Sequence, residues 1–220
     1  MSTNILFLIA HPDDEAFGPY GTIATLARDN KVTVVSLCNG ARPNFEEVAK
    51  YRAKAFKGSC DRLGVDHYIY DNPDLSLTYN ATVKIVEDIV RQLQPEIVYT
   101  HNISDLNNDH KVVAEAAMVA CRPKPESTVD ALYFFEVPAS TDWTFGQGHP
   151  AFESNIYVDI SDFIETKKWA LSLYTTETYE FPDARSIESM VTRAKFRGSQ
   201  VGLNYAEAFR LVFSRCHKIQ

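Results

Sequence analysis

The chain has 220 residues, 45% hydrophobic and 23% charged, a composition typical of a globular protein that buries a sizeable core. Its formal net charge of −7 argues against nucleic acid or an anionic membrane surface as the main partner, because both favour basic proteins. No apolar run reaches the roughly 20 residues that a membrane-spanning helix needs, and the opening "MSTNILFLIA" lacks the basic region of a secretory signal.

The first half of the chain alternates between strand-like and helix-like segments. Apolar or β-branched runs predict strands over residues 4–10, 31–38, 65–70 and 95–100. Helical spacing of the apolar residues predicts intervening helices over residues 21–30, 44–64, 80–94 and 109–121. This alternation implies parallel βαβ units, and therefore an α/β fold with a doubly wound, mostly parallel sheet flanked by helices.

The pattern is looser in the second half. Strands are predicted over residues 131–137 and 155–160, and helices over residues 161–174 and 186–202. The segment 138–154 is long, aromatic and rich in glycine and proline, which is typical of functional or disordered loops. We expect one domain over residues 1–220, with an irregular C-terminal region.

The spacing of the cysteines indicates a protein from a reducing compartment. Cys38, Cys60, Cys121 and Cys216 are scattered along the chain, and none lies in a CxxC pair. We therefore expect reduced, mostly buried thiols and a cytoplasmic protein.

Three polar loops follow predicted strands of the sheet. An acidic cluster follows the first strand, "NGARPN" (39–44) follows the second, and "HNISDLNNDH" (101–110) follows a later one. Doubly wound sheets bind ligands in the crevice beyond the carboxyl ends of their strands. The three loops therefore predict a functional site at that edge of the sheet.

The first of these loops carries residues that suit a metal ion. In "LFLIAHPDDEAFG", His11 offers an imidazole nitrogen and Asp14 a carboxylate, and His110 from the later loop would complete a His/Asp/His set. Zinc uses this mixture of ligands and, in catalytic sites, keeps one position open for water. Asp13 would then be free to act as a base toward that water, although the spacing alone does not decide which aspartate has which role.

A simpler interpretation is that the acids only cap a helix. Asp and Glu after a strand often stabilise the N-terminus of the next helix. The second cluster, "THNISDLNNDHKVVAEA", again follows a strand, pairs histidine with aspartate and enters a helix. Two such clusters on one sheet edge are difficult to attribute to capping alone.

The residues also resemble a known family. "AHPDDE" followed by "DLNNDHKVVAEA" is similar to the LmbE-like, or PIG-L, zinc-dependent N-deacetylases. The resemblance extends through "VSLCNG", "FFEVPASTDW" and "ARSIESMVTRAKFRGSQVGLNYAEAF", and so covers nearly the whole chain. It implies a Rossmann-like fold and hydrolysis of an N-acetyl group, with release of acetate, from an amino sugar such as N-acetylglucosamine within a glycoconjugate.

The resemblance also implies roles for individual residues. His11, Asp14 and His110 would be the zinc ligands, with another divalent metal as an alternative, and Asp13 would be the general base. Glu15 and Asp109 would orient these groups. Four residues are expected to contact the substrate: Arg42, Asp105, Asn107 and Arg185.

Some of these substrate contacts have alternatives. For Asp105 and Asn107, the alternative to substrate contact is that they shape their loop through Asx turns. For Arg185, the alternative is an ion pair with an acid such as Asp183. His101 ends a predicted strand and has either a structural or a binding role. The aromatic rings of Trp143 and Phe145 would stack on a sugar face, and for Trp143 the alternative is that it covers the core.

One departure from the family pattern concerns catalysis. Many relatives carry Pro-His-Pro-Arg-Ser where this chain has "PDARS", which places Asp183 at the histidine position. His149 is an alternative source of an imidazole. The departure leaves open a second class of function, a metal- and sugar-binding homologue with impaired catalysis. A nucleotide-binding enzyme is disfavoured, because no G-x-G-x-x-G follows the first strand. The oligomeric state and the identity of the conjugate are left open.

Overall fold

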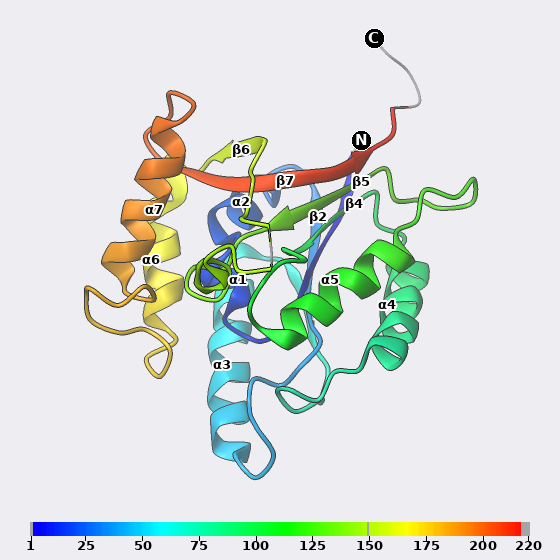
Figure 1. Ribbon diagram of the computed structural model, residues 1–220, viewed down its shortest axis with the longest axis horizontal. Coiled ribbons are helices and arrows are strands. Elements are labelled where there is room, and N and C mark those ends of the chain that lie inside the picture. Colours follow the sequence, from blue (N-terminus) through cyan, green and yellow to red (C-terminus); the bar gives the residue numbers. More distant parts are fainter. Residues whose placement is uncertain (1, 149, 217–220) are drawn as a thin grey trace.

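The computed structural model describes residues 2–148 and 150–216, which form one seven-stranded sheet (Figure 1). The strands are β1 (Asn4–Ile9), β2 (Lys31–Ser36), β3 (Asp66–Ile69), β4 (Ile97–His101), β5 (Ala131–Phe135), β6 (Ile156–Asp159) and β7 (Ala206–Ser214). Their order in the sheet is β3-β2-β1-β4-β5-β7-β6. The pairs from β3 to β5 are parallel, whereas β7 runs antiparallel to both of its neighbours.

Strand β1 shows why the sheet has a layer of helices on each face. Side chains alternate between the two faces of a strand. Ile5, Phe7 and Ile9 accordingly join one hydrophobic cluster, whereas Leu6 and Leu8 join another on the opposite face. A strand that is apolar on both faces has to be covered on both faces, as parallel sheets generally are.

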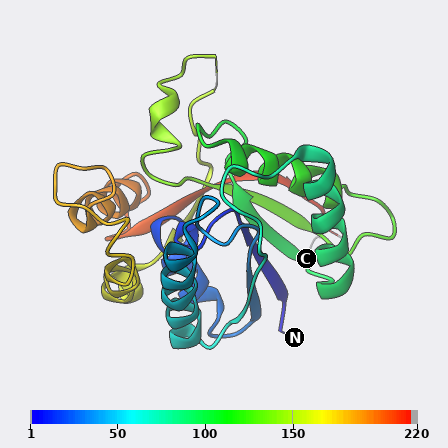
Figure 2. The same cartoon turned by 90° about the horizontal axis from the view of Figure 1, so that it is seen from below.

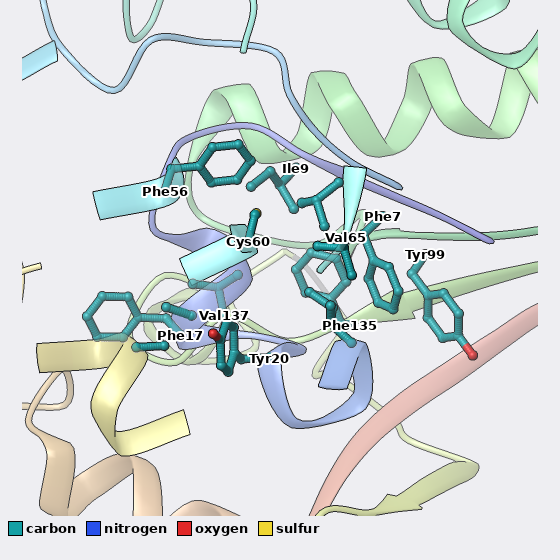
Figure 3. Close-up of a cluster of buried hydrophobic side chains, with 14 of the residues drawn as sticks. Phe7, Ile9, Phe17, Tyr20, Phe56, Cys60, Val65, Tyr99, Phe135 and Val137 are labelled. Atoms are coloured by element: carbon teal, nitrogen blue, oxygen red, sulfur yellow. The ribbon is translucent and has the colours of Figure 1, made fainter. Parts of the chain in front are cut away.

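The helices divide into two layers (Figures 1 and 2). One layer packs against the cluster that contains Leu6, and its helices are α4 (Tyr79–Leu93) and α5 (Asn108–Ala120). The other layer packs against the cluster that contains Phe7, and its helices are α1 (Asp14–Phe17), α2 (Tyr20–Leu26), α3 (Glu46–Leu63), α6 (Ile164–Ser172) and α7 (Ile187–Ser199). Figure 3 shows this second cluster, in which the rings of Phe7 and Tyr99 stack with centroids 4.6 Å apart.

The elements predicted from the sequence are present, with ends that differ by a few residues. Helix α3 ends at Leu63 and is capped by Gly64, whose φ of 65° is the left-handed conformation that glycine adopts most easily. The predicted helix over residues 161–174 divides into a 3₁₀ turn (Ser161–Phe163) and α6. The doubly wound, mostly parallel α/β sheet flanked by helices is confirmed.

Strand β7 was not predicted. The segment Ala206–Ser214 inserts between β5 and β6, and its first four residues are buried. Its pairing partners lie far away along the chain, so no local turn signal identifies it as a strand.

The C-terminal strand is joined to the rest of the fold by a buried ion pair. The Glu207 carboxylate in β7 accepts hydrogen bonds from the backbone N–H groups of Gly21 (2.9 Å) and Thr22 (2.7 Å) at the start of α2. Lys167 of α6 donates to the same carboxylate at 2.6 Å and to the Gly18 carbonyl oxygen. Glu207 therefore connects the end of the chain to its first helices.

The fold brings the loops after β1, β2, β4 and β5 to one edge of the sheet. Strand β1 lies between β2 and β4, so the chain winds outward in opposite directions on its two sides. This is the topological switch point at which doubly wound sheets bind ligands. Among residues 2–148 and 150–216, none of the helices combines the length and apolar character needed to traverse a lipid bilayer.

The buried ion pair yields a stability prediction. Replacing Lys167 by methionine leaves the Glu207 charge without its cation, and breaking a buried pair in this way typically costs about 3–5 kcal/mol. We expect urea denaturation of Lys167→Met to show a loss of that size. The control is Lys168→Met, which removes an exposed pair with Glu165 and should change stability by less than about 0.5 kcal/mol. Equal stability of the two variants would contradict this role for Lys167.

Candidate active site

The chain turns sharply after β1. Strand β1 ends at Ile9 and α1 begins at Asp14. Asp13, between them, has a φ of 139°, a conformation that side-chain-bearing residues rarely adopt. The backbone N–H of Asp13 donates to Glu15 Oε2 (3.1 Å), and its carbonyl accepts from the N–H groups of Ala16 and Phe17. Strained backbone held by surrounding contacts is concentrated at functional sites.

His11 lies between two carboxylates. Its Nδ1 is 3.5 Å from Asp14 Oδ2, and its Nε2 is 3.0 Å from Asp109 Oδ2. The Asp109 carboxylate accepts the Nε2–H, which leaves Nδ1 as the nitrogen that faces Asp14. Burial opposes the charged imidazole, but the hydrogen bonds to Asp109 and Asp14 outweigh it and raise the pKa of His11 well above its usual value.

His110 has the same arrangement on the other side of Asp14. Its Nε2 is 3.2 Å from Asp14 Oδ1, and its Nδ1 is 3.2 Å from Asp105 Oδ1. Burial again opposes the charge, but Asp14 and Asp105 raise the pKa of His110 to about 9. Burial likewise opposes ionisation of Asp14, yet His110 and His101 lower its pKa well below the usual value.

The donor atoms of His11, Asp14 and His110 lie within 4.8 Å of one another, and all three residues are buried. They offer two imidazole nitrogens and a carboxylate, the mixture that catalytic zinc sites use. The remaining nitrogen of each imidazole is held by a carboxylate, as is usual for metal-bound histidines. The residues present therefore fit a divalent cation.

His101 lies beneath His110. The two rings stack with centroids 3.9 Å apart, and His101 Nε2 accepts the backbone N–H of Ala10 at 2.8 Å. Burial, and then the nearby charge of His110, lower the pKa of His101 to about 4. His101 is thus neutral at pH 7, and its accepting nitrogen is occupied by the backbone.

Asp13 projects into a cavity of about 220 Å³ beside these ligands. Its Oδ2 is 2.6 Å from Nη2 of Arg185, whose guanidinium also lies 4.0 Å above the Phe17 ring. The cavity is lined by His11, Asp13, Asp14, Arg42, Arg52, Asp74, Leu75, Asn107, His110, Val137, Ser140, Glu177 and Arg185.

The structure places the other predicted residues in different ways. Arg42 is exposed at the cavity, and Arg185 lies within it, paired with Asp13 rather than with the side chain of Asp183. Asp105 was expected to contact substrate, but it is fully buried and does not line the cavity. Its carboxylate accepts from Thr141 Oγ1 at 2.6 Å and faces His110.

Asn107 lines the cavity, but its side chain also accepts the backbone N–H of Asp109 at 2.9 Å and caps α5. The backbone N–H of Asn107 in turn donates to Asp105 Oδ1 at 2.8 Å. The Asx turns that were the alternative to substrate contact are therefore present at both residues.

Glu15 supports the turn rather than the imidazoles. Its Oε1 accepts from Ser59 Oγ (2.7 Å) and from the Tyr174 hydroxyl (2.5 Å), and Oε2 accepts from the Asp13 N–H. Burial raises the pKa of Glu15 to about 7, although the hydrogen bonds from Tyr174 and Ser59 favour the carboxylate.

Asp183, the residue that departs from the family pattern, lies outside the cavity lining. Asp183 is exposed and accepts the backbone N–H of Arg185 at 2.8 Å, so it shapes the turn before α7. Trp143 and Phe145 are 48% and 75% exposed and therefore do not cover the core. His149 lies outside the described residues.

Sequence reasoning missed several residues of the site. Arg52, Asp74 and Glu177 line the cavity and form an ion-paired group with Arg185. Arg52 lies on a helix predicted to be an ordinary amphipathic one, and Glu177 lies in a segment without regular structure. Only their proximity in the folded chain identifies them.

Comparisons with known proteins identify relatives of this chain. The profile of the PIG-L family, described as GlcNAc-PI de-N-acetylase, matches residues 6–121. A probable N-acetyl-alpha-D-glucosaminyl L-malate deacetylase 2 of Bacillus cereus is 22% identical over 194 residues, which cover 81% of this chain and 85% of the relative.

Solved structures share the fold. The 4-carboxy-2-hydroxymuconate hydratase GalB of Pseudomonas putida aligns over 100% of both chains with a TM-score of 0.77 and 22% identity. The N,N'-diacetylchitobiose deacetylase of Pyrococcus horikoshii aligns over 94% of this chain and 83% of its own, with a TM-score of 0.75 and 23% identity. The matched profile spans more than half of the chain and includes His11, Asp14 and His110, and the chain therefore belongs to the PIG-L (LmbE-like) family of deacetylases.

Proposed function

We propose that the protein is a divalent-metal-dependent hydrolase that removes the N-acetyl group from an amino sugar and releases acetate. The observation that carries this proposal is the buried set of His11, Asp14 and His110 around one point, with the Asp13 carboxylate in the adjoining cavity. Membership of a deacetylase family supports the reaction class. The names of two relatives, which specify an N-acetylglucosaminyl malate and diacetylchitobiose, support an amino sugar as substrate.

His11, Asp14 and His110 would hold the cation, and Asp105 and Asp109 would fix the tautomers of the two imidazoles. When bound, Zn²⁺ or another divalent ion supplies Lewis-acid activation of water and of the amide carbonyl.

The buried thiols Cys38, Cys60 and Cys121 support a location in the reducing cytoplasm.

Asp13 is proposed as the general base. It takes a proton from the attacking water and later returns it to the nitrogen of the departing amine. The Glu15 carboxylate fixes its backbone, and Arg185 fixes its side chain at 2.6 Å. Both contacts hold the carboxylate toward the cavity before substrate binds, so the side chain does not have to change rotamer during the reaction.

Arg185 is proposed to stabilise the negative charge that develops on the acetyl oxygen. Its guanidinium lines the cavity beside the Asp13 carboxylate, so its positive charge lies next to the place where the acetyl group is proposed to bind. A donor aimed at a developing oxyanion typically contributes about 10²–10³ in rate.

Asp183 stands where many relatives have histidine, but it lies outside the cavity. This departure therefore does not favour the alternative of a binding protein with impaired catalysis.

The cavity has a volume of about 220 Å³. Pockets that enclose a whole ligand usually measure about 300–1,000 Å³, so this cavity is too small for a complete glycoconjugate. We propose that the acetamido group and its sugar ring enter the cavity and that the remainder of the conjugate lies outside. Arg42, exposed at the cavity, is placed to bind sugar hydroxyls or an anionic substituent.

The fold alone does not identify the reaction, because a hydratase has the same fold. Both reactions use an activated water, but only deacetylation releases acetate and a free amine. A panel of N-acetylated amino sugars, assayed for acetate, separates the two. Hydration of an unsaturated tricarboxylate such as 4-carboxy-2-hydroxymuconate, without acetate release from any sugar, would contradict the proposal.

Metal removal is the first test. We expect a chelator to abolish acetate release and one equivalent of Zn²⁺ per chain to restore it, because His11, Asp14 and His110 form a single ligand set. Metal content by mass spectrometry and acetate release are measured on the same samples. His110→Ala should bind zinc at least about tenfold more weakly. Full activity of the metal-free protein would contradict the proposal.

Replacing Asp13 by asparagine tests the assigned base. The variant should keep its zinc and lose about 10²–10⁴ in kcat, since the amide cannot accept the proton. The matched control is Asp162→Asn, which alters an exposed aspartate on the surface and should leave kcat unchanged. An active Asp13→Asn enzyme with normal zinc content would overturn the assignment.

Replacing Arg185 by alanine tests the proposed oxyanion donor. We expect kcat to fall about 10²–10³-fold with unchanged zinc content. KM should change much less, because the lost interaction strengthens only in the transition state. The control is Arg28→Ala, which removes an exposed arginine. A rise in KM at constant kcat would assign Arg185 to substrate binding instead.

A further inference from the structure

A second group of metal-ligating side chains surrounds the other nitrogen of His11. His11 Nε2 is 3.0 Å from Asp109 Oδ2 and 3.8 Å from Asp74 Oδ1. Cys38 Sγ is 3.9 Å from the same Asp109 oxygen, and the donors of His11, Cys38 and Asp109 lie within 4.8 Å of one another. None of these contacts uses the Nδ1 side of His11 that faces Asp14.

The spacing of these donors matches the spacing around a tetrahedral cation. Bond lengths of about 2.0 Å to N and O and about 2.3 Å to S place neighbouring ligand atoms about 3.3 Å (N to O) and about 3.5 Å (S to O) apart. The observed N to O distances are 3.0 and 3.8 Å, and the observed S to O distance is 3.9 Å. Small rotations of the side chains would bring these distances to the values expected around a cation.

Unpartnered oxygens support the same location. Asp109 is fully buried, and its Oδ2, which faces His11, also accepts the backbone N–H of Leu75 at 2.6 Å, whereas its Oδ1 has no hydrogen-bond partner in the part of the chain that the structure describes. The same holds for Asp74 Oδ1, the oxygen that faces His11 Nε2. Buried polar atoms without partners are rare in folded proteins, so the Asp74 oxygen that faces the imidazole, and the second oxygen of the Asp109 carboxylate, support a missing ligand at this place.

We propose that His11, Cys38 and Asp109, with Asp74 on the cavity side, form an accessory site for a soft divalent cation such as Zn²⁺ or Cd²⁺. The ion enters from the cavity, which Asp74 and His11 both line. On binding, the thiol proton of Cys38 and the proton on His11 Nε2 leave to solvent, so that the thiolate and the Nε2 lone pair become ligands. A thiolate favours zinc and cadmium over magnesium, calcium or manganese.

The accessory site competes with the catalytic one for a single imidazole. A neutral imidazole has one lone pair and one N–H. A cation at Nε2 takes the lone pair there and leaves the proton on Nδ1, which then cannot bind the cation between Asp14 and His110. Excess soft metal should therefore inhibit by holding His11 in the wrong tautomer, a consequence that rests on the proposed function.

The accessory site is tested by the ultraviolet charge-transfer absorption of a cadmium–thiolate bond. Cd²⁺ is titrated into metal-free protein in a Cys216→Ser background, because Cys216 is exposed. We expect the band in this background and its loss in Cys38→Ser. The matched control is Cys121→Ser, which removes another buried thiol, at the far end of α5 from Asp109, and should keep the band. No band in the background protein, or an unchanged band in Cys38→Ser, would overturn the proposal.

A second variant guards against misfolding of Cys38→Ser. Asp74→Asn changes a partly exposed ligand and leaves every thiol in place. The cadmium band should then require at least about tenfold more Cd²⁺. Retention of the original cadmium affinity would exclude Asp74 from the site and contradict the proposal as stated.

Turnover provides a separate readout. Zinc beyond one equivalent should inhibit acetate release in the background protein and inhibit it much less in Cys38→Ser. Equal inhibition of both proteins would overturn the competition between the sites. Absence of any deacetylation would count against the proposed function, whereas the cadmium absorption would still decide the accessory site.

Discussion

The site depends on two buried imidazoles that are each held between ionised carboxylates. His11 lies between Asp14 and Asp109, and His110 lies between Asp14 and Asp105. Isolated charges in such a buried place would be costly, and these groups are tolerated only because each has an opposite charge in direct contact. Asp109 and Asp105 hold one nitrogen of each ring, and the other nitrogen of each ring faces Asp14, where a cation would take the place of the protons.

Much of the fold serves to hold this group of charges. The parallel sheet brings the ends of β1 and β4 together, and α5 begins at the loop that carries Asp109 and His110. The turn at Asp13 is strained, and the buried Glu15 holds it through hydrogen bonds that reach Ser59 and Tyr174. Rigid support of this kind is what allows a carboxylate to remain within reach of a reacting water.

Asp105 and Cys38 show how the surroundings of a residue decide its role. Asp105 sits in a loop that follows a strand and would suit substrate contact, but burial and the hydroxyl of Thr141 commit its carboxylate to His110. Cys38 would be an inert core thiol in most settings. Here it adjoins Asp109 and the second nitrogen of His11, which makes it a candidate ligand.

The sequence by itself determined the alternation of strands and helices, and it predicted the edge of the sheet for the site and the candidate donors His11, Asp14 and His110, which the structure brings together. These conclusions were accessible because they depend on local periodicity and on the rule that the carboxyl ends of parallel strands meet at one edge. Only the tertiary structure decided that Arg185 pairs with Asp13 across 172 positions, that Arg52 and Glu177 line the cavity, and that β7 inserts beside β5. Contacts between residues so far apart depend on how irregular loops pack onto the finished sheet, and no periodic pattern in the chain records that packing.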